Sequence, residues 1–461
     1  MNTLEKDKKD KAFYKRMMAL SVPITIQFLL TSFLSMVDSL MVGQLGEVSI
    51  ASVGVANKIT IILILITQGF ASGAGIFAAQ YWGRKDKVGI SKILIITTTI
   101  ISGFTIVATF FVVGFANQLI YLFSPDQAVV GLGSSYIKII AISYFFTGIT
   151  IILTVILRSM GEVKLPMYFS VFAILLNTLL NYLFIFGNGG FPEMGIEGAA
   201  IATVIARTIH CVLMVLLIRQ FNLFSAFRLI DMKEVFESGL VKSYFVISVP
   251  SILNHIFWTL GETSYFWVFA RMGTNELAAA TLIDPLIFLF MAVFIGLGDA
   301  ASVMIGNSIG SERFKETYQY GKKFLLITFG LSIVASAGVL LVAPLFVSFY
   351  NVSSIVSEYA ISILYVYAVI LPFKMLNQVN NIGILRAGGD TKFVMYLDLI
   401  GVWLVGLPLA LIGAYAGFPI YVVFGLANIQ EVVRILFGLK RTLSRKWMNV
   451  VVEEESKCNV S

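Results

Sequence analysis

Long apolar stretches recur along the whole chain, and they constrain its fold more than any other feature. A helix needs about 20 apolar residues to cross the hydrocarbon core of a bilayer. Twelve such stretches follow one another between residues 19 and 440, and they leave no segment for a soluble domain. Only 13% of the 461 residues are charged, against about a quarter in soluble proteins. The sequence therefore predicts an all-α integral membrane protein with twelve transmembrane helices.

The expected limits of these helices are 19–42, 51–81, 92–116, 132–157, 167–187, 196–218, 244–268, 277–308, 323–348, 357–385, 394–414 and 418–440.

Lys and Arg are concentrated in every second loop between the predicted helices. Cytoplasmic loops of membrane proteins collect these residues. With the N-terminus inside, the six loops on the other side contain only Arg271. Both termini are thus predicted to be cytoplasmic, in a multi-pass protein of the cell membrane without a cleaved signal peptide. The net charge of +7 comes from these loops and does not indicate a nucleic-acid partner.

The Cys and His residues do not form a pattern typical of catalysis or metal binding. Cys211 falls within a predicted helix and Cys458 in the C-terminal tail, while His210 and His255 are far apart in sequence. We find no arrangement of a nucleophile with a base. The sequence predicts neither an enzyme nor a bound cofactor.

The chain repeats itself at an offset of 227–228 residues. SVP at 21–23 recurs at 248–250, and ILRSMGEVK at 156–164 resembles ILRAGGDTK at 384–392. We infer two six-helix bundles of the same topology with a cavity between them. Pro23 and Pro250 are interpreted as first-turn prolines, with a hinge as the alternative.

The expected parts are a cytoplasmic tail (1–18), an N-lobe (19–218), a cytoplasmic linker (219–243), a C-lobe (244–440) and a second cytoplasmic tail (441–461).

Five acidic residues fall within predicted helices, where a charge is costly and often functional. Asp38, Glu262 and Asp284 are expected at similar depth in the outer half of the membrane. Each is a candidate for ion coupling, with a structural hydrogen bond as the alternative for Asp38 and Glu262. Asp299 is expected to make a structural hydrogen bond, and Asp398 to pair with Arg386 or Lys392 on the cytoplasmic side.

Other polar and aromatic residues are expected near these acids. Asn177 and Asn181 share one helix face, and Thr203 falls in the outer half of the next helix. Lys374 could pair with Glu262 or Asp284. For Asp284, a buried pair with Lys374 is as plausible as a role in transport. Three aromatic residues flank Glu262, and they either pack within the bundle or line a cavity suited to flat, lipophilic cations: Trp258, Tyr265 and Trp267.

With these motifs the chain resembles the multidrug and toxic compound extrusion (MATE) family over residues 15–440. The resemblance implies two six-helix lobes that export organic cations against inward H⁺ or Na⁺. It implies that Asp38 is the helix-1 acid, with Asn177, Asn181 and Thr203 as the polar cluster around it. Glu262 matches a helix-7 acid and Asp284 a helix-8 acid. The motifs are VPITIQFLLTSFLSMVDSLMVGQLG, AAQYWGRKD, ILRSMGEVKLP, NTLLNYLFIFGNGGFPEMGIEGAAIATVIAR, GETSYFWVFARMG, ASVMIGNSIG, ILRAGGDTK and VWLVGLPLA.

Three positions depart from the family pattern. At position 181 this chain has Asn, where one branch of the family has a second acid. Trp258 stands where helix 7 of the family often carries another acid. Helix 10 of another branch has an acid near position 377, and this chain has the neutral Asn377 there. The coupling ion is therefore left open between H⁺ and Na⁺. A carboxylate in a partly dry cavity is disfavoured in its charged form, so Asp38 could exchange a proton. Alternatively, Asp38 could hold Na⁺ with oxygens of Asn177, Asn181 and Thr203.

We thus expect a monomeric antiporter of organic cations that works by alternating access between the lobes. A lipid-linked oligosaccharide flippase is the main alternative; it should line its cavity with cationic residues. A channel is a third class. The residues expected to couple ions are Asp38, Asn177, Asn181, Thr203, Glu262 and Asp284. Those expected to line the substrate cavity are Trp258, Tyr265, Trp267, Lys374 and Asn377.

Overall fold

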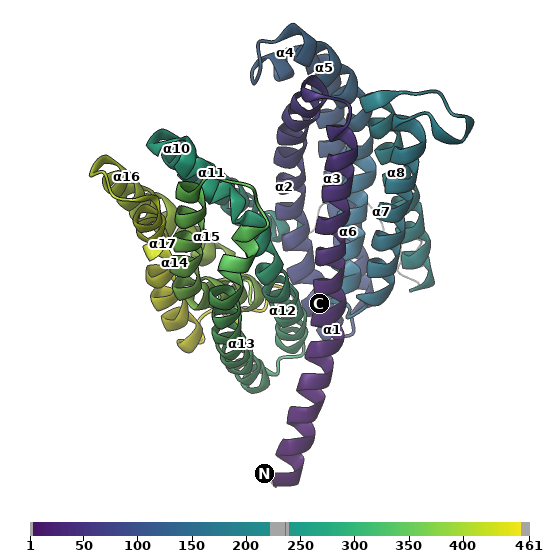
Figure 1. The fold of residues 1–461 in the computed structure, drawn as a ribbon. Coiled ribbons are helices and arrows are strands. Elements are labelled where there is room, and N and C mark those ends of the chain that lie inside the picture. Colours follow the sequence, from purple (N-terminus) through teal and green to yellow (C-terminus); the bar gives the residue numbers. More distant parts are fainter. Residues whose placement is uncertain (1–2, 222–235, 237–238, 453–461) are drawn as a thin grey trace. The chain divides into compact units, whose positions relative to one another are not determined.

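The fold is taken from a computed structural model, which describes residues 3–221, 236 and 239–452 (Figure 1). All regular structure in these residues is helical. Eleven helical segments are long and apolar enough to cross a membrane. The pair Gln127–Ala141 and Ser143–Ser159, bent by 46°, makes a twelfth. The predicted all-α membrane fold with twelve spans is confirmed.

The first half of the chain contains α1 (Thr3–Gly43), α2 (Glu47–Gly83), α3 (Lys87–Gly114), α4 (Ala116–Tyr121), α5 (Gln127–Ala141), α6 (Ser143–Ser159), α7 (Lys164–Ile185), the short 3₁₀ helix η1 (Asn188–Gly190) and α8 (Gly195–Gln220). The second half contains α10 (Leu240–Met272), α11 (Thr274–Leu282), α12 (Asp284–Gly310), α13 (Phe314–Ser348), α14 (Ser354–Gln378), the π-helical η3 (Val379–Arg386), α15 (Thr391–Leu399), the π-helical η4 (Ile400–Gly406), α16 (Leu407–Tyr415) and α17 (Ile420–Leu443).

The chain forms two compact units whose boundaries fall inside helices. One unit contains residues 26–252, and the other contains residues 1–25 together with 253–461. Each of α1 and α10 therefore begins in one unit and ends in the other. The two crossing points, after Thr25 and after Ile252, are 227 residues apart, which is the offset of the sequence repeat.

Pro23 and Pro250 lie near these crossing points, inside α1 and α10. The expectation that they occupy the first helical turn is wrong, because both helices begin earlier, at Thr3 and Leu240. The segment before Pro23 is rich in Lys, Ala, Met and Leu, which favour helix and extend it. Proline within a membrane helix is tolerated where neighbouring groups satisfy the freed backbone carbonyl.

Two glycines make equivalent close contacts at the crossing points. In the unit of residues 26–252, a Cβ at Gly69 would lie 2.6 Å from the Cα of Ile252. In the other unit, a Cβ at Gly296 would lie 2.7 Å from the carbonyl oxygen of Ser21 and close to the Thr25 hydroxyl. Gly69 and Gly296 are again 227 residues apart. Small residues let membrane helices approach closely.

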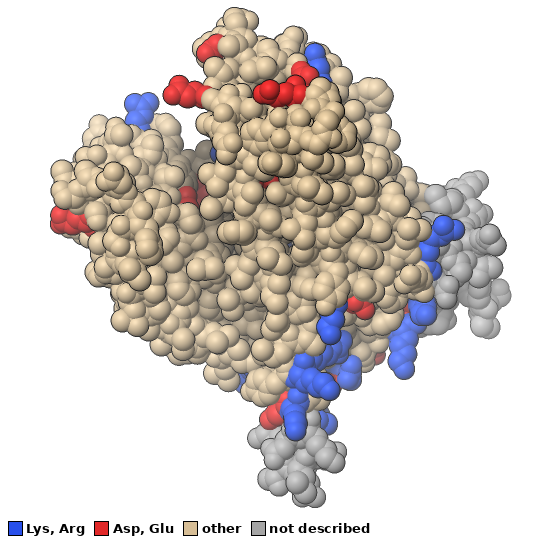
Figure 2. Space-filling view, turned by 45° about the vertical axis from the view of Figure 1, so that its right-hand side comes forward, with Lys and Arg blue, Asp and Glu red and all other residues tan. Residues whose placement is uncertain are grey.

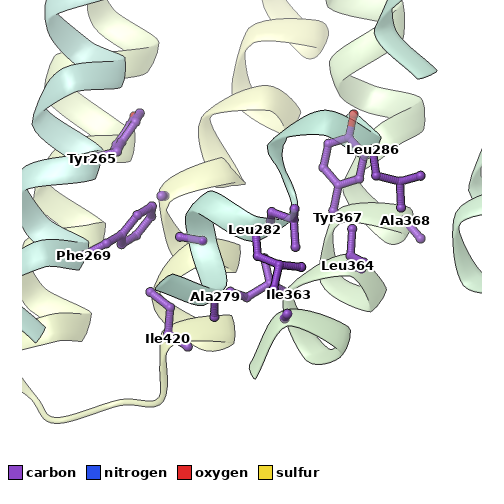
Figure 3. Packing of buried hydrophobic residues seen from close by; sticks show 14 of the residues in the cluster. Tyr265, Phe269, Ala279, Leu282, Leu286, Ile363, Leu364, Tyr367, Ala368 and Ile420 are labelled. Carbon is purple, nitrogen blue, oxygen red and sulfur yellow. The ribbon is translucent and has the colours of Figure 1, made fainter. Parts of the chain in front are cut away.

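Each unit has its own apolar core. In residues 26–252 the core includes Val42, Ile59, Ile120, Ile137 and Ile196, which come from five helices. The core of the other unit joins α10, α11, α12, α14 and α17, and its packing is drawn in Figure 3.

The two predicted tails contribute contacts to the unit that contains the C-lobe. Phe13 is 2% exposed and lies 5.1 Å from the Tyr320 ring and 5.2 Å from the Phe324 ring. Trp447 is fully buried, and Asn449 donates a backbone hydrogen bond to the carbonyl of Gly388 at 3.0 Å.

Most of the predicted linker lies outside the described residues. Figure 2 shows that uncharged residues form most of the visible surface.

Candidate functional site

Asp38 on α1 lies half-buried against two polar side chains of α7. The amide of Asn181 donates from Nδ2 to Oδ1 of Asp38 at 3.0 Å, and the hydroxyl of Thr178 donates to the same oxygen at 3.3 Å. Thr178 and Asn181 are three residues apart, so they share a helix face. The sequence analysis did not name Thr178, although its spacing from Asn181 is the signal that could have found it.

The same face of α7 reaches α8 through a second pair. Asn177 donates from Nδ2 to Oγ1 of Thr203 at 3.2 Å, and the Thr203 hydroxyl donates to the carbonyl of Ala199 at 2.9 Å. The three residues predicted around Asp38 thus lie where hydrogen bonds join α7 to α1 and to α8. The groups of α7 aimed at Asp38 are an amide nitrogen and a hydroxyl, which stabilise a carboxylate by donating to it. Na⁺ would instead require oxygens around it, as hard cations do.

A groove lies beside this polar group at the C-terminal ends of α1 and α7. Its volume is about 510 Å³, and apolar side chains form most of its wall. Thr178 both lines the groove and contacts Asp38. The lining residues are Met41, Gln44, Leu175, Thr178, Leu179, Tyr182 and Phe186. An apolar wall with a carboxylate at its edge suits a lipophilic molecule that carries a positive charge.

Arg207 is a second charged group among the spanning helices of this unit, and the sequence analysis missed it. It lies on α8, four residues after Thr203, and donates from Nη1 to Oγ1 of Thr147 on α6 at 2.7 Å. Counting every Arg inside a predicted helix, and not only in the loops, would have found it.

In the other unit, Glu262 on α10, Asp284 on α12 and Lys374 on α14 are each half-buried. Asp284 lies within electrostatic range of both Glu262 and Lys374. Among the described residues, no ion pair within 4.0 Å joins Lys374 to either acid. The three predicted residues therefore share a neighbourhood without forming a closed salt bridge.

The residues expected to line the substrate cavity separate into two groups. Trp258 and Trp267 are 40% and 54% exposed. Tyr265 is 6% exposed, packs in the core and donates its hydroxyl to the carbonyl of Val402 at 3.4 Å (Figure 3). Asn377 is 1% exposed. Tyr265 and Asn377 thus lie in the packed interior, since their helix faces meet other helices and not an open surface.

Asn377 belongs to a buried charged network centred on Arg434 of α17. Arg434 forms an ion pair with Asp398 of α15 and donates from Nη1 to both carboxylate oxygens of Glu431 at 3.2 Å. Asn377 donates from Nδ2 to Oε2 of Glu431 at 2.8 Å. All four residues are less than 10% exposed. Burial of this kind is tolerated only where charges are paired and hydrogen-bonded.

The network also includes α10 and η3. Asn254 donates from Nδ2 to Oδ2 of Asp398 at 2.7 Å, and Arg386 donates from Nη2 to Oδ1 of Asn254 at 2.7 Å. The direct ion pair of Asp398 is therefore with Arg434 and not with Arg386 or Lys392, while Arg386 lies within electrostatic range of Asp398 and is linked to it through Asn254. Those residues are near Asp398 in sequence, but packing of α17 brings Arg434 to it. The signal for Arg434 was its position three residues after Glu431 in an otherwise apolar stretch.

No cluster of three or more His, Cys, Asp or Glu side chains in the described residues could hold a metal ion.

The MatE family model matches the chain twice, over residues 23–183 and 250–412. The chain is 25% identical over 458 residues to "Uncharacterized transporter YisQ" of Bacillus subtilis (strain 168), covering 97% of each protein. It is 28% identical over 402 residues to "Probable multidrug resistance protein NorM" of Photorhabdus laumondii, covering 86% of this chain and 87% of that one.

Among solved structures, a mutant of the Vibrio cholerae MATE transporter VcmN has a TM-score of 0.86 at 17% identity, and the match covers 95% of this chain and 99% of that one. A MOP superfamily transporter from Pyrococcus furiosus has a TM-score of 0.80 at 19% identity, with coverage of 94% and 96%.

Proposed function

This chain belongs to the MatE family of membrane transporters, and from that premise we propose that it is a multidrug efflux antiporter of organic cations. The names of relatives such as the NorM proteins support multidrug efflux. The observation that carries the substrate class is the position of Asp38 beside the apolar groove between α1 and α7. The proposal places the protein in the cell membrane as a monomer, with both termini in the cytoplasm and without a cofactor.

In the proposed cycle, ionised Asp38 attracts the positive charge of a lipophilic compound in the groove. Protonation of Asp38 from outside removes that charge, and the compound leaves. A coupling acid must change its charge once per cycle, and half-burial makes Asp38 responsive to such a change. Ion and drug then exchange through alternating access.

Between the two candidate ions, the arrangement at Asp38 favours H⁺. Asn181 and Asn177 both present amide nitrogens to their partners, Asp38 and Thr203. Of the two, the Asn181 amide donates to the Asp38 carboxylate and stabilises its ionised form without a bound cation. Coupling to Na⁺ would require oxygens of Asn177, Asn181 and Thr203 to turn toward the ion together with Asp38. Glu262 and Asp284 are retained as second-lobe contributors to coupling.

The test measures ethidium uptake into inverted vesicles that contain the full chain, under separately imposed pH and Na⁺ gradients. We expect ethidium transport driven by the pH gradient, and we expect Asp38→Asn to abolish it. Asn keeps the volume and an acceptor oxygen but cannot ionise. Matched expression and an unchanged melting temperature in detergent would show that the variant is folded.

Near wild-type transport by Asp38→Asn under both gradients would make Asp38 structural, and would direct the search to Glu262 and Asp284. Transport driven by the Na⁺ gradient alone would contradict the choice of H⁺. Failure to move ethidium, combined with movement of a lipid-linked oligosaccharide, would favour the flippase alternative.

A further inference from the structure

Arg207 lies about halfway along α8, a helix apolar enough to span a membrane. Its guanidinium donates to Thr147, and no acidic side chain in the described part of the chain forms an ion pair with it. An arginine in this position is costly, and such residues usually mark a binding site or a pathway. The structure therefore leaves a positive charge in the unit that contains Asp38 without a direct counter-charge.

The neighbours of Arg207 hold it in place but do not neutralise it. The Thr147 hydroxyl donates to the carbonyl of Ser143 at 2.7 Å, so it can only accept from Arg207. With Nη1 used in this bond, Nε and Nη2 remain as donors, and neither is sealed in the interior. These two nitrogens form one edge of the guanidinium, and that edge matches a carboxylate with two parallel hydrogen bonds.

Tyr136 of α5 supplies a second unused donor. Its side chain is 6% exposed and lies within electrostatic range of both Arg207 and Asp38. Its hydroxyl makes no hydrogen bond to any described residue and, like Nε and Nη2 of Arg207, is not sealed in the interior, so it is available as a donor. The neighbouring Tyr144 differs, because its hydroxyl bonds to Thr60 at 3.0 Å. An available hydroxyl within electrostatic range of a guanidinium that has no ion-pair partner in the described residues offers hydrogen-bond donors to an anionic group.

We propose that Arg207 and Tyr136 form an anion subsite that binds the carboxylate of a transported compound. This inference rests on the proposed export function and narrows its substrate class. With Asp38 taking the cationic end and Arg207 the carboxylate end, the N-lobe selects organic cations that also carry a carboxylate. The variant Arg207→Gln then removes one charge-assisted hydrogen bond to the carboxylate of such a compound and weakens its binding. The affinity for a cation without a carboxylate stays unchanged.

The experiment compares two dyes that differ only in this group: rhodamine B, which has a free carboxylate, and rhodamine B ethyl ester. Binding to the purified full chain in detergent is measured by fluorescence anisotropy. We expect the wild type to bind rhodamine B more tightly than the ester. A charge-assisted hydrogen bond corresponds to roughly 10- to 100-fold in affinity, so Arg207→Gln should weaken rhodamine B binding by at least about tenfold. Binding of the ester should stay unchanged.

Tyr136→Phe should weaken rhodamine B binding by several-fold, again without changing the ester. Lys138→Gln is the matched control, because Lys138 is an exposed cation on the same helix and its removal should change neither dye. If Arg207→Gln fails to fold, Arg207→Lys keeps the charge but loses the planar fork, and it should still reduce the preference for rhodamine B.

Three results would overturn the subsite: no wild-type binding of rhodamine B, equal wild-type affinity for the two dyes, or equal loss of both dyes in Arg207→Gln. The last would make Arg207 a structural residue or a counter-charge for Asp38. Failure of the proposed export is distinguishable, since the purified wild type would then show the dye preference while vesicles transport neither dye.

Discussion

Two arginine side chains, Arg434 and Arg207, differ in whether an acidic side chain compensates their charge. Arg434 is buried and paired with Asp398 and Glu431, whereas Arg207 has a hydrogen bond from one nitrogen and, in the described residues, no ion pair with an acid. A buried pair is weak support for stability, but removing one partner leaves an uncompensated charge. We therefore expect the residues around Arg434 to serve the fold, and we propose those around Asp38 and Arg207 for transport.

Arg434→Met should destabilise the protein strongly, because it leaves the carboxylates of Asp398 and Glu431 buried without their cation. Loss of one partner of a buried pair costs about 3–5 kcal/mol. We expect a large fall in melting temperature in detergent, measured by a thermal-shift assay.

Lys392→Met is the control, since Lys392 is an exposed cation near Asp398 in sequence and its removal should leave the melting temperature unchanged. Combining Arg434→Met with Asp398→Asn and Glu431→Gln should recover part of the loss. Equal melting temperatures for Arg434→Met and the wild type would show that the network contributes little.

At the scale of elements, α1 and α10 are each shared between the two compact units, and a close glycine contact accompanies each crossing. The π-helical segments η3 and η4 interrupt the helices around the charged network, and π-helical turns occur often at functional sites. η3 contributes Arg386 to the network, and the Val402 carbonyl of η4 accepts from Tyr265. The π-helical segments thus add contacts to a network whose charged residues Arg434, Glu431 and Asp398 stand on regular α-helices.

Gly69→Ala and Gly296→Ala should both destabilise the protein, because in each case the new methyl group meets backbone atoms that cannot move aside easily. Overpacking of this kind costs about 1–3 kcal/mol. Gly103→Ala should be neutral or slightly stabilising, since nothing lies within 4 Å of its Cβ position and alanine favours helix. Melting temperatures of the three variants test the prediction. Tolerance of alanine at both crossing points would mean that these helices are not tightly packed there.

At the scale of the whole molecule, the units do not coincide with the halves of the sequence. The unit that contains most of the second half includes residues 1–25, and the other unit includes residues up to 252. Duplication therefore produced two bundles that each need a segment from the other half. Phe13, buried beside Tyr320 and Phe324, shows that this segment contributes real packing.

If the chain is divided between residues 221 and 236 and both fragments are expressed together, they should associate and co-purify through a tag on one of them. Each fragment alone lacks a helical segment of its unit, so it should aggregate or be degraded. The measurement is size-exclusion chromatography of the fragments, alone and together. A C-terminal fragment that is monodisperse and stable by itself would contradict the shared organisation.

The membrane class, the number of spans and the duplication were determined by the sequence alone. The length of each span follows from the thickness of the bilayer. The duplication is visible in the sequence as residue patterns that recur at a constant offset. The neighbours of Asp38 were also predictable, because Asn177 and Asn181 lie one turn apart on a helix and so share a face. Thr178 lies at that same face, and reading the spacing of i, i+3 residues more fully would have included it.

Only the tertiary structure decided which helices bring their polar faces together. Arg434 reaches Asp398 across 36 residues, Arg207 reaches Thr147 across 60, and Tyr265 turns into the core. In a membrane, apolar side chains face both lipid and protein, so hydrophobic periodicity does not tell which face of a helix is inward. The helices that share one site come from distant parts of the chain, and their contacts depend on how whole helices pack.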